Sequence, residues 1–174
     1  MEYNYCRRCG TPLEQKSDHF WKCENGHSSY LNPSPASGVF FLADNNEVVV
    51  SRRAIDPGKG SLDTIGGFVD NDESAEQAIA REILEESGLT PDDYGELNIF
   101  CTAPTGYEYE GEVKRVLSTF FWARLPQDAQ PLPSDDVAEI VTLPLHDIDV
   151  SKFYGDDVKI ALVKLQQLVK DGHV

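Results

Sequence analysis

The spacing of apolar residues along the chain alternates between a period of two and a helical period, which predicts a β-sheet with helices packed on it. Runs rich in β-branched and aromatic side chains, bounded by polar turns, predict strands: residues 37–43, 47–52, 96–103, 113–124 and 139–143. The first two runs flank the polar turn 44–46 and form a hairpin. Loops are expected between the later runs, over residues 104–112 and 126–136.

Two segments have helical spacing instead. Residues 156–170 repeat apolar side chains three and four positions apart, which predicts a helix with one buried face. A second helix is expected over residues 75–87. Ser74 and Gln77 form a capping box at its start, and Gly88 suits the left-handed position at its end. The residues of this helix expected to point toward the core are Ile79, Ala80, Ile83 and Leu84.

The first 32 residues have a different character, because cysteines replace the apolar runs. Four side chains that can hold a zinc ion follow the spacing of two metal-binding knuckles: Cys6, Cys9, Cys23 and His27. Gly26 stands where a second C-x2-C pair would have its last cysteine, and the histidine after it can supply the fourth ligand. His19 is a further candidate ligand.

A ribbon of this size is too small to fold without a metal. Four protein ligands leave no open coordination position, so the pattern indicates a structural site rather than a catalytic one. A ribbon that has lost its metal is the alternative. Residues 30–35 form an expected linker, because their two prolines favour extended backbone. The chain is therefore expected to divide into a zinc ribbon, residues 1–32, and a larger domain, residues 33–174.

Charge and composition narrow the partners and the compartment. A net charge of −15 argues against a nucleic-acid partner, because binding to a phosphate backbone needs a basic face. A small anionic substrate is still compatible when divalent cations cover the carboxylates. The chain shows no signal peptide and no apolar run long enough for a membrane span, so we expect a cytoplasmic protein. Four cysteines, two of them spaced as C-x2-C, fit metal binding in a reducing compartment.

Residues 67–89, GFVDNDESAEQAIAREILEESGL, contain the densest candidate chemistry. Glu82, Glu85 and Glu86 fall within an arc of roughly 100° on the predicted helix. Carboxylates at this spacing repel one another unless a cation lies among them. Hard oxygen ligands at this density suit Mg²⁺ or Mn²⁺. The alternative is an ordinary solvated acidic face.

The whole segment matches the Nudix box, G-x5-E-x7-R-E-U-x-E-E-x-G-U with U aliphatic, at every specified position. The chain therefore resembles the Nudix hydrolases, and its ribbon is similar to that of NADH pyrophosphatase and related proteins. The resemblance implies an α/β/α sandwich on a mixed β-sheet, preceded by the small zinc ribbon. It also implies Mg²⁺- or Mn²⁺-dependent hydrolysis of the pyrophosphate bond of a nucleoside diphosphate linked to another group, such as ADP-ribose or NADH. Ribbon-bearing relatives often form homodimers, so the resemblance suggests a homodimer.

The resemblance also assigns roles within the box. Glu82 and Glu86 are expected to hold the main metal ions, and Glu85 to share them or to act as a base. The backbone carbonyl of Gly66 is a further expected ligand, on the tight loop that Gly66 shares with Gly67.

Residues around the metal ligands have expected roles as well. Arg81 is expected to pair with Glu73 and to brace the loop against the helix. A later carboxylate acts as general base or ligand in many family members. Three acids here are candidates, and Glu139 is preferred because it opens a predicted strand: Asp135, Asp136 and Glu139.

The substrate and two other functional classes stay open. The S-Q-P-W-P-F-P signature of NADH pyrophosphatases is missing, and residues 100–105 read FCTAPT in the corresponding region. Tyr107 and Tyr109 either frame a base or ribose pocket or lie half-buried in a plain turn. A Nudix-fold sensor that binds a nucleotide without cleaving it is one alternative, although the complete set of box carboxylates favours hydrolysis. A zinc-ribbon adaptor for protein or nucleic acid is the other.

Overall fold

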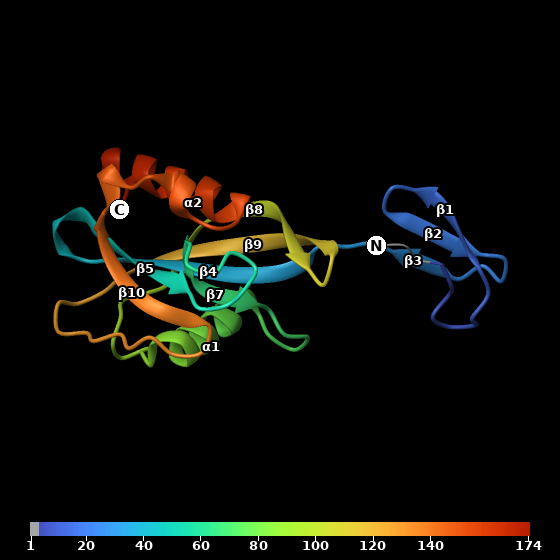
Figure 1. The fold of residues 1–174 in the computed structure, drawn as a ribbon, viewed down its shortest axis with the longest axis horizontal. Helices are drawn as coiled ribbons and strands as arrows, with labels where there is room; N and C mark the ends of the chain where they lie inside the picture. Colours follow the sequence, from blue (N-terminus) through green and yellow to red (C-terminus); the bar gives the residue numbers. More distant parts are fainter. Residues whose placement is uncertain (1–3) are drawn as a thin grey trace.

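The computed structural model describes residues 4–174, which form two β-sheets. The smaller sheet has three antiparallel strands: β1 (Leu13–Ser17), β2 (Phe20–Cys23) and β3 (Ser28–Tyr30). Figure 1 shows it as a separate unit at one end of the molecule, joined to the rest by a short extended segment. The expected small ribbon is therefore present, as a three-stranded sheet. Its link to the next strand is shorter than expected, because only residues 31–33 separate β3 from β4.

The larger part of the chain folds around a seven-stranded mixed sheet with the main order β10-β5-β4-β9-β8. Its strands are β4 (Ser34–Leu42), β5 (Glu47–Arg53), β6 (Leu62–Asp63), β7 (Ile65–Phe68), β8 (Asn98–Tyr109), β9 (Glu112–Arg124) and β10 (Val137–Pro144). β4 and β9 run parallel along the whole of β4, and the other pairs are antiparallel. The short strands β6 and β7 branch off, pairing with β5 and β4 respectively.

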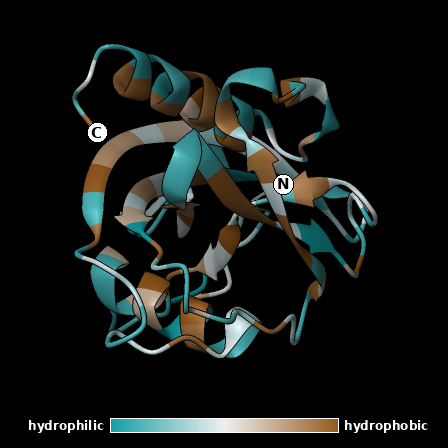
Figure 2. Ribbon diagram, turned by 90° about the vertical axis from the view of Figure 1, so that its left-hand side faces the viewer, coloured by the Kyte–Doolittle hydropathy of each residue, from teal (hydrophilic) through white to brown (hydrophobic). Residues whose placement is uncertain are grey.

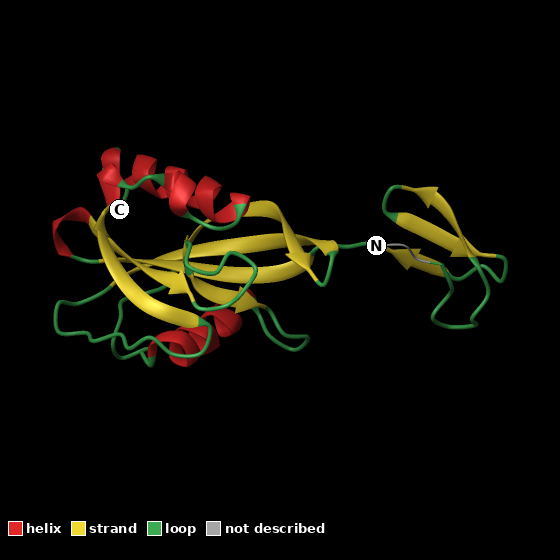
Figure 3. Ribbon diagram, viewed as in Figure 1, coloured by secondary structure: helices red, strands yellow, loops and turns green. Residues whose placement is uncertain are grey.

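Helices α1 (Ala75–Ser87) and α2 (Asp156–Lys170) cover opposite faces of this sheet (Figure 3), which confirms the expected α/β/α sandwich. Three short 3₁₀ helices complete the described elements: η1 (Asp44–Asn46), η2 (Leu145–Asp147) and η3 (Val150–Lys152). Ser74 and Gln77 form the predicted capping box of α1, and Gly88 ends the helix with a φ of 69°. No helix within residues 4–174 is long and apolar enough to cross a membrane.

The core lies in two layers, one on each side of the sheet. Consecutive strand residues point to opposite faces, so Phe40 packs in the layer under α2 and Phe41 in the layer under α1. Hydrophobic stretches accordingly run along the strands between the helices (Figure 2). The expected core position of Leu84 is wrong, because its side chain is 52% exposed. It lies roughly 100° around α1 from the buried Ile83 and so faces solvent.

The predicted loop over residues 104–112 is also wrong. β8 continues to Tyr109 and β9 begins at Glu112, so only Glu110 and Gly111 turn the chain, both with positive φ. Pro104 lies within β8, where it is tolerated because β8 is an edge strand and proline cannot donate a ladder hydrogen bond. The long hairpin brings Tyr107 to the mouth of a cavity instead of leaving it on a turn.

Candidate catalytic site and metal centre

Glu86 is the buried carboxylate at the centre of the candidate site. It lies near the end of α1, is 7% exposed, and accepts a hydrogen bond of 2.9 Å from the backbone N–H of Gly66. Burial and, to a smaller extent, neighbouring carboxylates raise the pKa of Glu86 to about 8, against the lowering effect of the Gly66 hydrogen bond. A divalent cation would relieve this repulsion, since it favours the ionised form.

Arg81 lies among the other acids of the box. Its Nε donates to Glu73 Oε1 at 2.8 Å, and its Nη1 donates to Glu82 at 2.8 Å and to Glu85 at 2.9 Å. A further bond of 3.1 Å reaches the backbone carbonyl of Phe68. The guanidinium therefore ties the loop after β7 to α1 and neutralises carboxylates that would otherwise repel one another.

Two glycines bring the β7 backbone close to its neighbours. Gly66 has a φ of +149°, and a Cβ there would lie 2.1 Å from the carbonyl oxygen of Ser37. A Cβ on Gly67 would lie 2.4 Å from Glu82 Oε1. The lack of a side chain at Gly67 therefore lets the backbone meet the Glu82 carboxylate directly, and the lack of one at Gly66 lets β7 lie close against β4.

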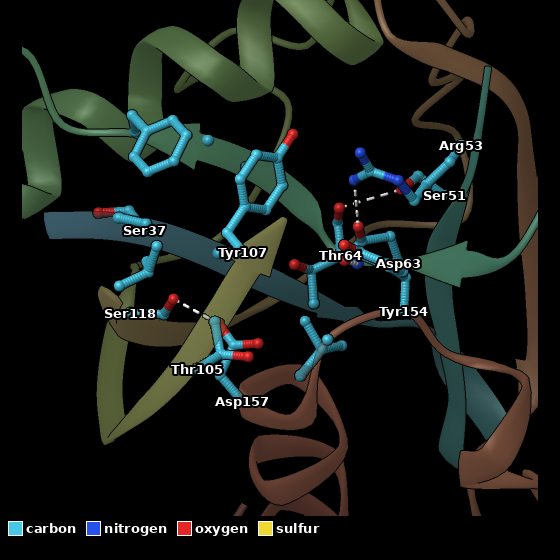
Figure 4. A pocket seen from close by; sticks show the side chains of 18 of the residues that line it. Ser37, Ser51, Arg53, Asp63, Thr64, Thr105, Tyr107, Ser118, Tyr154 and Asp157 are labelled. Carbon is cyan, nitrogen blue, oxygen red and sulfur yellow. Dashed lines mark hydrogen bonds and ion pairs between the residues drawn. The ribbon is translucent and has the colours of Figure 1, made fainter. Parts of the chain in front are cut away.

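A cavity opens beside this cluster, with walls from β4, β5, β7, β8 and β9 and from the start of α2 (Figure 4). Arg53 and Asp63 form an ion pair of 2.7 Å in its wall, and Arg53 also donates to the carbonyl of Pro57. The ring of Tyr154 lies 4.8 Å from the Arg53 guanidinium. Burial raises the pKa of Asp63 to about 6, although Arg53 acts in the opposite direction.

Aromatic side chains edge the same cavity. Tyr107 contacts Phe68 and Tyr154 edge to face, with ring centroids 5.7 and 6.4 Å apart. These rings come from β7, β8 and the segment before α2, and all three line the cavity. They form an apolar surface next to the carboxylates.

The structure brings some of the predicted acids together and leaves others apart. Glu86 and Asp136 both line the cavity, whereas Glu85 is nearer the surface, with a side chain 46% exposed. Glu139 is not among the described residues that line the cavity. Its side chain is 58% exposed and accepts a 2.9 Å hydrogen bond from Arg52 Nε.

Asp63 and Asp157 line the cavity but were not candidates from sequence. Neither residue lies in a recognisable motif, and the place of each in the cavity wall depends on strands far away in the chain.

The ribbon contains the second candidate metal centre. One ligand atom from each of Cys6, Cys9, Cys23 and His27 lies within 4.8 Å of the others. The Cys9 and Cys23 sulfurs are 3.8 Å apart, and His27 Nδ1 lies 3.6 Å from the Cys6 sulfur. Tetrahedral zinc requires about 3.8 Å between sulfurs and about 3.6 Å between nitrogen and sulfur, so these residues fit the ion. His19 is outside this group, with Nδ1 3.4 Å from Ser17 Oγ.

A mixed sheet between two helices, with a complete box helix beside a cavity, defines the class of Nudix hydrolases. The model of the NUDIX domain family matches residues 32–163. The chain is therefore a member of the NUDIX domain family.

Similar proteins agree with this assignment. The ADP-ribose pyrophosphatase of Methanocaldococcus jannaschii is 40% identical over 63 residues, 36% of each chain. The NAD-capped RNA hydrolase NudC of Haemophilus influenzae is 27% identical over 146 residues, which cover 75% of this chain and 54% of NudC. The chain thus spans between about a third and a half of the length of these curated relatives.

Solved structures show the same fold. A NUDIX hydrolase from Nitrosomonas europaea superposes with a TM-score of 0.66 at 21% identity, covering 98% of this chain and 93% of that one. The NUDIX domain of NrtR from Shewanella oneidensis, crystallised with ADP ribose, gives a TM-score of 0.63 at 18% identity over 79% of this chain and 89% of that one.

Proposed function

We propose that this protein hydrolyses the pyrophosphate bond of a nucleoside diphosphate linked to another group, with Mg²⁺ as the preferred metal and ADP-ribose and NADH as the leading substrates. The observation that supports this most is the convergence of Glu82 and Glu86 on the Gly66–Gly67 backbone beside the cavity. Relatives named for ADP-ribose and for NAD-capped RNA support the choice of substrates.

The proposed metal ligands are Glu82, Glu86 and the carbonyl oxygen of Gly66, with Glu85 sharing the metal from the rim. Bound Mg²⁺ supplies charge neutralisation of the diphosphate and a more acidic attacking water. The N–H of Gly66 orients the Glu86 carboxylate through its 2.9 Å hydrogen bond. Arg81 and Glu73 hold the loop and helix in register, as positioning residues.

We assign the general base to Asp136 in preference to Glu139. Asp136 lines the cavity, and its charge contributes to raising the pKa of Glu86. A carboxylate in that position can accept the proton of an attacking water. Glu139 instead accepts a hydrogen bond from Arg52 and is not among the described residues that line the cavity.

The rest of the chain has a supporting role in this proposal. A structural Zn²⁺ held by Cys6, Cys9, Cys23 and His27 keeps the ribbon folded, and the boundary with the catalytic domain lies between residues 32 and 33. The proposed substrate is a small molecule, since a net charge of −15 disfavours binding to extended nucleic acid. The proposed compartment is the cytoplasm. A homodimer is proposed as the assembly, to be checked by light scattering.

The test is a panel of nucleotide diphosphates incubated with and without Mg²⁺, with the products separated by chromatography. We expect Mg²⁺-dependent cleavage to a nucleoside monophosphate. Glu86→Gln should lower kcat by roughly a hundredfold or more, while Glu76→Gln, an exposed acid on the same helix, should leave it unchanged. Binding without cleavage in the wild type would support a sensor instead and refute hydrolysis.

A further inference from the structure

Asp157 is a buried carboxylate that the proposed hydrolysis does not use. It is the second residue of α2, is 6% exposed, and lines the cavity on the α2 side. Ser118 on β9 donates a hydrogen bond of 2.5 Å to its Oδ2 (Figure 4). Within residues 4–174, this is the one hydrogen bond made to the Asp157 carboxylate.

The carboxylate does not serve as a helix cap. The N-cap of α2 is Gly155, and no side chain caps the helix. A Cβ on Gly155 would lie 2.6 Å from Asp157 Oδ1, so glycine leaves this oxygen its space. Ser118 on one side and Gly155 on the other therefore fix the carboxylate in place. The neighbouring Asp156 has the ordinary role of a first-turn acid: it is exposed and contacts Lys159 at 3.3 Å.

A carboxylate held in this way has acceptor capacity left over. An ionised Asp offers about four acceptor positions, and burying it is costly unless they are used. Arg53, the arginine in the cavity wall, is already bound to Asp63 and to the Pro57 carbonyl. The α2 side of the cavity therefore favours a ligand that brings N–H donors and disfavours one that brings a negative charge.

The shape of the cavity adds a second requirement. The rings of Phe68, Tyr107 and Tyr154 edge it and present an apolar surface to whatever enters. Aromatic side chains of this kind pack well against a planar ring. A planar ligand ring that carries an amino group satisfies both the aromatic edge and the buried acceptor.

We infer that Asp157 is a specificity-determining residue, which accepts a hydrogen bond from the –NH₂ group of the substrate's planar ring. Adenine and the carboxamide of nicotinamide share this chemistry. Ser118 is the positioning residue that holds the carboxylate. The inference rests on the proposed function, which places the diphosphate at Glu86 on the α1 side of the same cavity.

The test compares ligands that differ at the amino group, using calorimetry on the full wild-type chain with Mg²⁺. One pair is AMP and purine riboside 5′-monophosphate, which lacks the amino group. The other is nicotinamide mononucleotide and nicotinic acid mononucleotide, in which a carboxylate replaces the amide. In at least one pair, the amino-bearing ligand should bind roughly ten- to a hundredfold more tightly. The pair that shows the preference identifies the ring, and equal binding within both pairs overturns the inference.

Two matched variants locate the effect. Asp157→Asn keeps an oxygen for Ser118 but removes the charge, and should reduce the preference to about threefold or less. Asp156→Asn, one residue away and exposed, should keep the wild-type preference. Ser118→Ala should weaken the preference and raise KM without an equal loss of kcat. A full preference in folded Asp157→Asn refutes the assignment, and if that variant does not fold, the wild-type comparison decides.

Binding is measured without turnover, so the two proposals can fail separately. A protein that discriminates between the ligands but cleaves no diphosphate would remove the proposed hydrolysis and leave the role of Asp157. A protein that cleaves ADP-ribose but binds both members of each pair equally would remove only the role of Asp157.

Discussion

Gly67 places the backbone of β7 directly against the carboxylate of Glu82, with space for a hydrogen atom but not for a methyl group. A Cβ at residue 67 would lie 2.4 Å from Glu82 Oε1. At the adjacent Gly66, a Cβ would instead lie 2.1 Å from the Ser37 carbonyl, in a backbone conformation that other residues rarely adopt. The two glycines thus have different functions: one leaves space for a side chain of the site, and the other for the main chain of the sheet.

The first prediction separates these functions. In Gly67→Ala, the Glu82 carboxylate can move aside to make room for the methyl group. This movement should cost the fold little stability, but it should weaken metal binding. We expect kcat/KM to fall by about a hundredfold, with a midpoint of urea unfolding close to that of the wild type. Gly66→Ala should lose about 2 kcal/mol or more of unfolding free energy, because backbone cannot move aside as a side chain does. Similar stability losses in both variants would contradict this distinction.

The second prediction concerns pH and Glu86. Burial raises its pKa from 4.5 to about 8, so the metal-free folded state holds this proton more tightly than the unfolded chain does. The stabilisation of the folded state that comes from this raised pKa of Glu86 is fully present below pH 4.5 and is lost as pH rises through about 8. The melting temperature of the metal-free protein should therefore decline across this window. Added Mg²⁺ should raise it more at pH 8 than at pH 6, because the metal binds the ionised form.

Glu86→Gln provides the control for this pH dependence. The amide cannot ionise, so the variant should show a weaker decline in melting temperature and little response to Mg²⁺. Asp63, whose pKa burial raises from 3.8 to about 6, leaves a residual slope at lower pH. An unchanged decline in Glu86→Gln would assign the effect to another group.

The third prediction compares two acids of β10 and the loop before it. Asp136→Asn should lower kcat by roughly a hundredfold or more if this residue takes the proton of the water. Glu139→Gln should change kcat by no more than about threefold, because an exposed ion pair contributes little. The steady-state rates of both variants on ADP-ribose decide between the two acids. A larger loss in Glu139→Gln would return the role to that residue.

The fourth prediction uses the two histidines of the ribbon. Atomic absorption should find zinc in equal amount to the protein in the wild type and in His19→Ala, since His19 lies outside the ligand group. His27→Ala should lose zinc, and proteolysis should then cleave the chain before residue 34, because the ribbon cannot stay folded without the metal. Full zinc content in His27→Ala would exclude it as a ligand.

How far the sequence predicted the molecule depends on how local each feature is. The two ends of helix α1 were predicted correctly, because Ser74, Gln77 and Gly88 act on their own neighbours. The ribbon cluster lies within one short stretch of chain and was predicted in the same way. The outer half of the β8–β9 hairpin was not predicted, because the polar residues of this segment are typical of a loop. Its two strands are stabilised by pairing with each other, which the pattern of either one alone does not reveal.

The missed parts of the site are long-range. The Ser118–Asp157 bond joins residues 39 positions apart, and the Arg52–Glu139 bond joins residues 87 positions apart. Spacing within one element cannot predict either contact, because the first depends on how α2 packs on β9 and the second on the pairing of β10 with β5. The same pairing of β10 with β5 leaves Asp136 on the cavity and Glu139 beside Arg52.

The parallel pairing of β4 with β9 also determines when the protein can fold during its synthesis. β4 ends at Leu42 and β9 begins at Glu112, 70 positions later, so the central strand pair cannot form until most of the chain has left the ribosome. The ligands of the ribbon are complete by His27, long before that point. The four ligands of the ribbon are therefore synthesised first, while the apolar face of α1 is left without its β9 partner until later in synthesis.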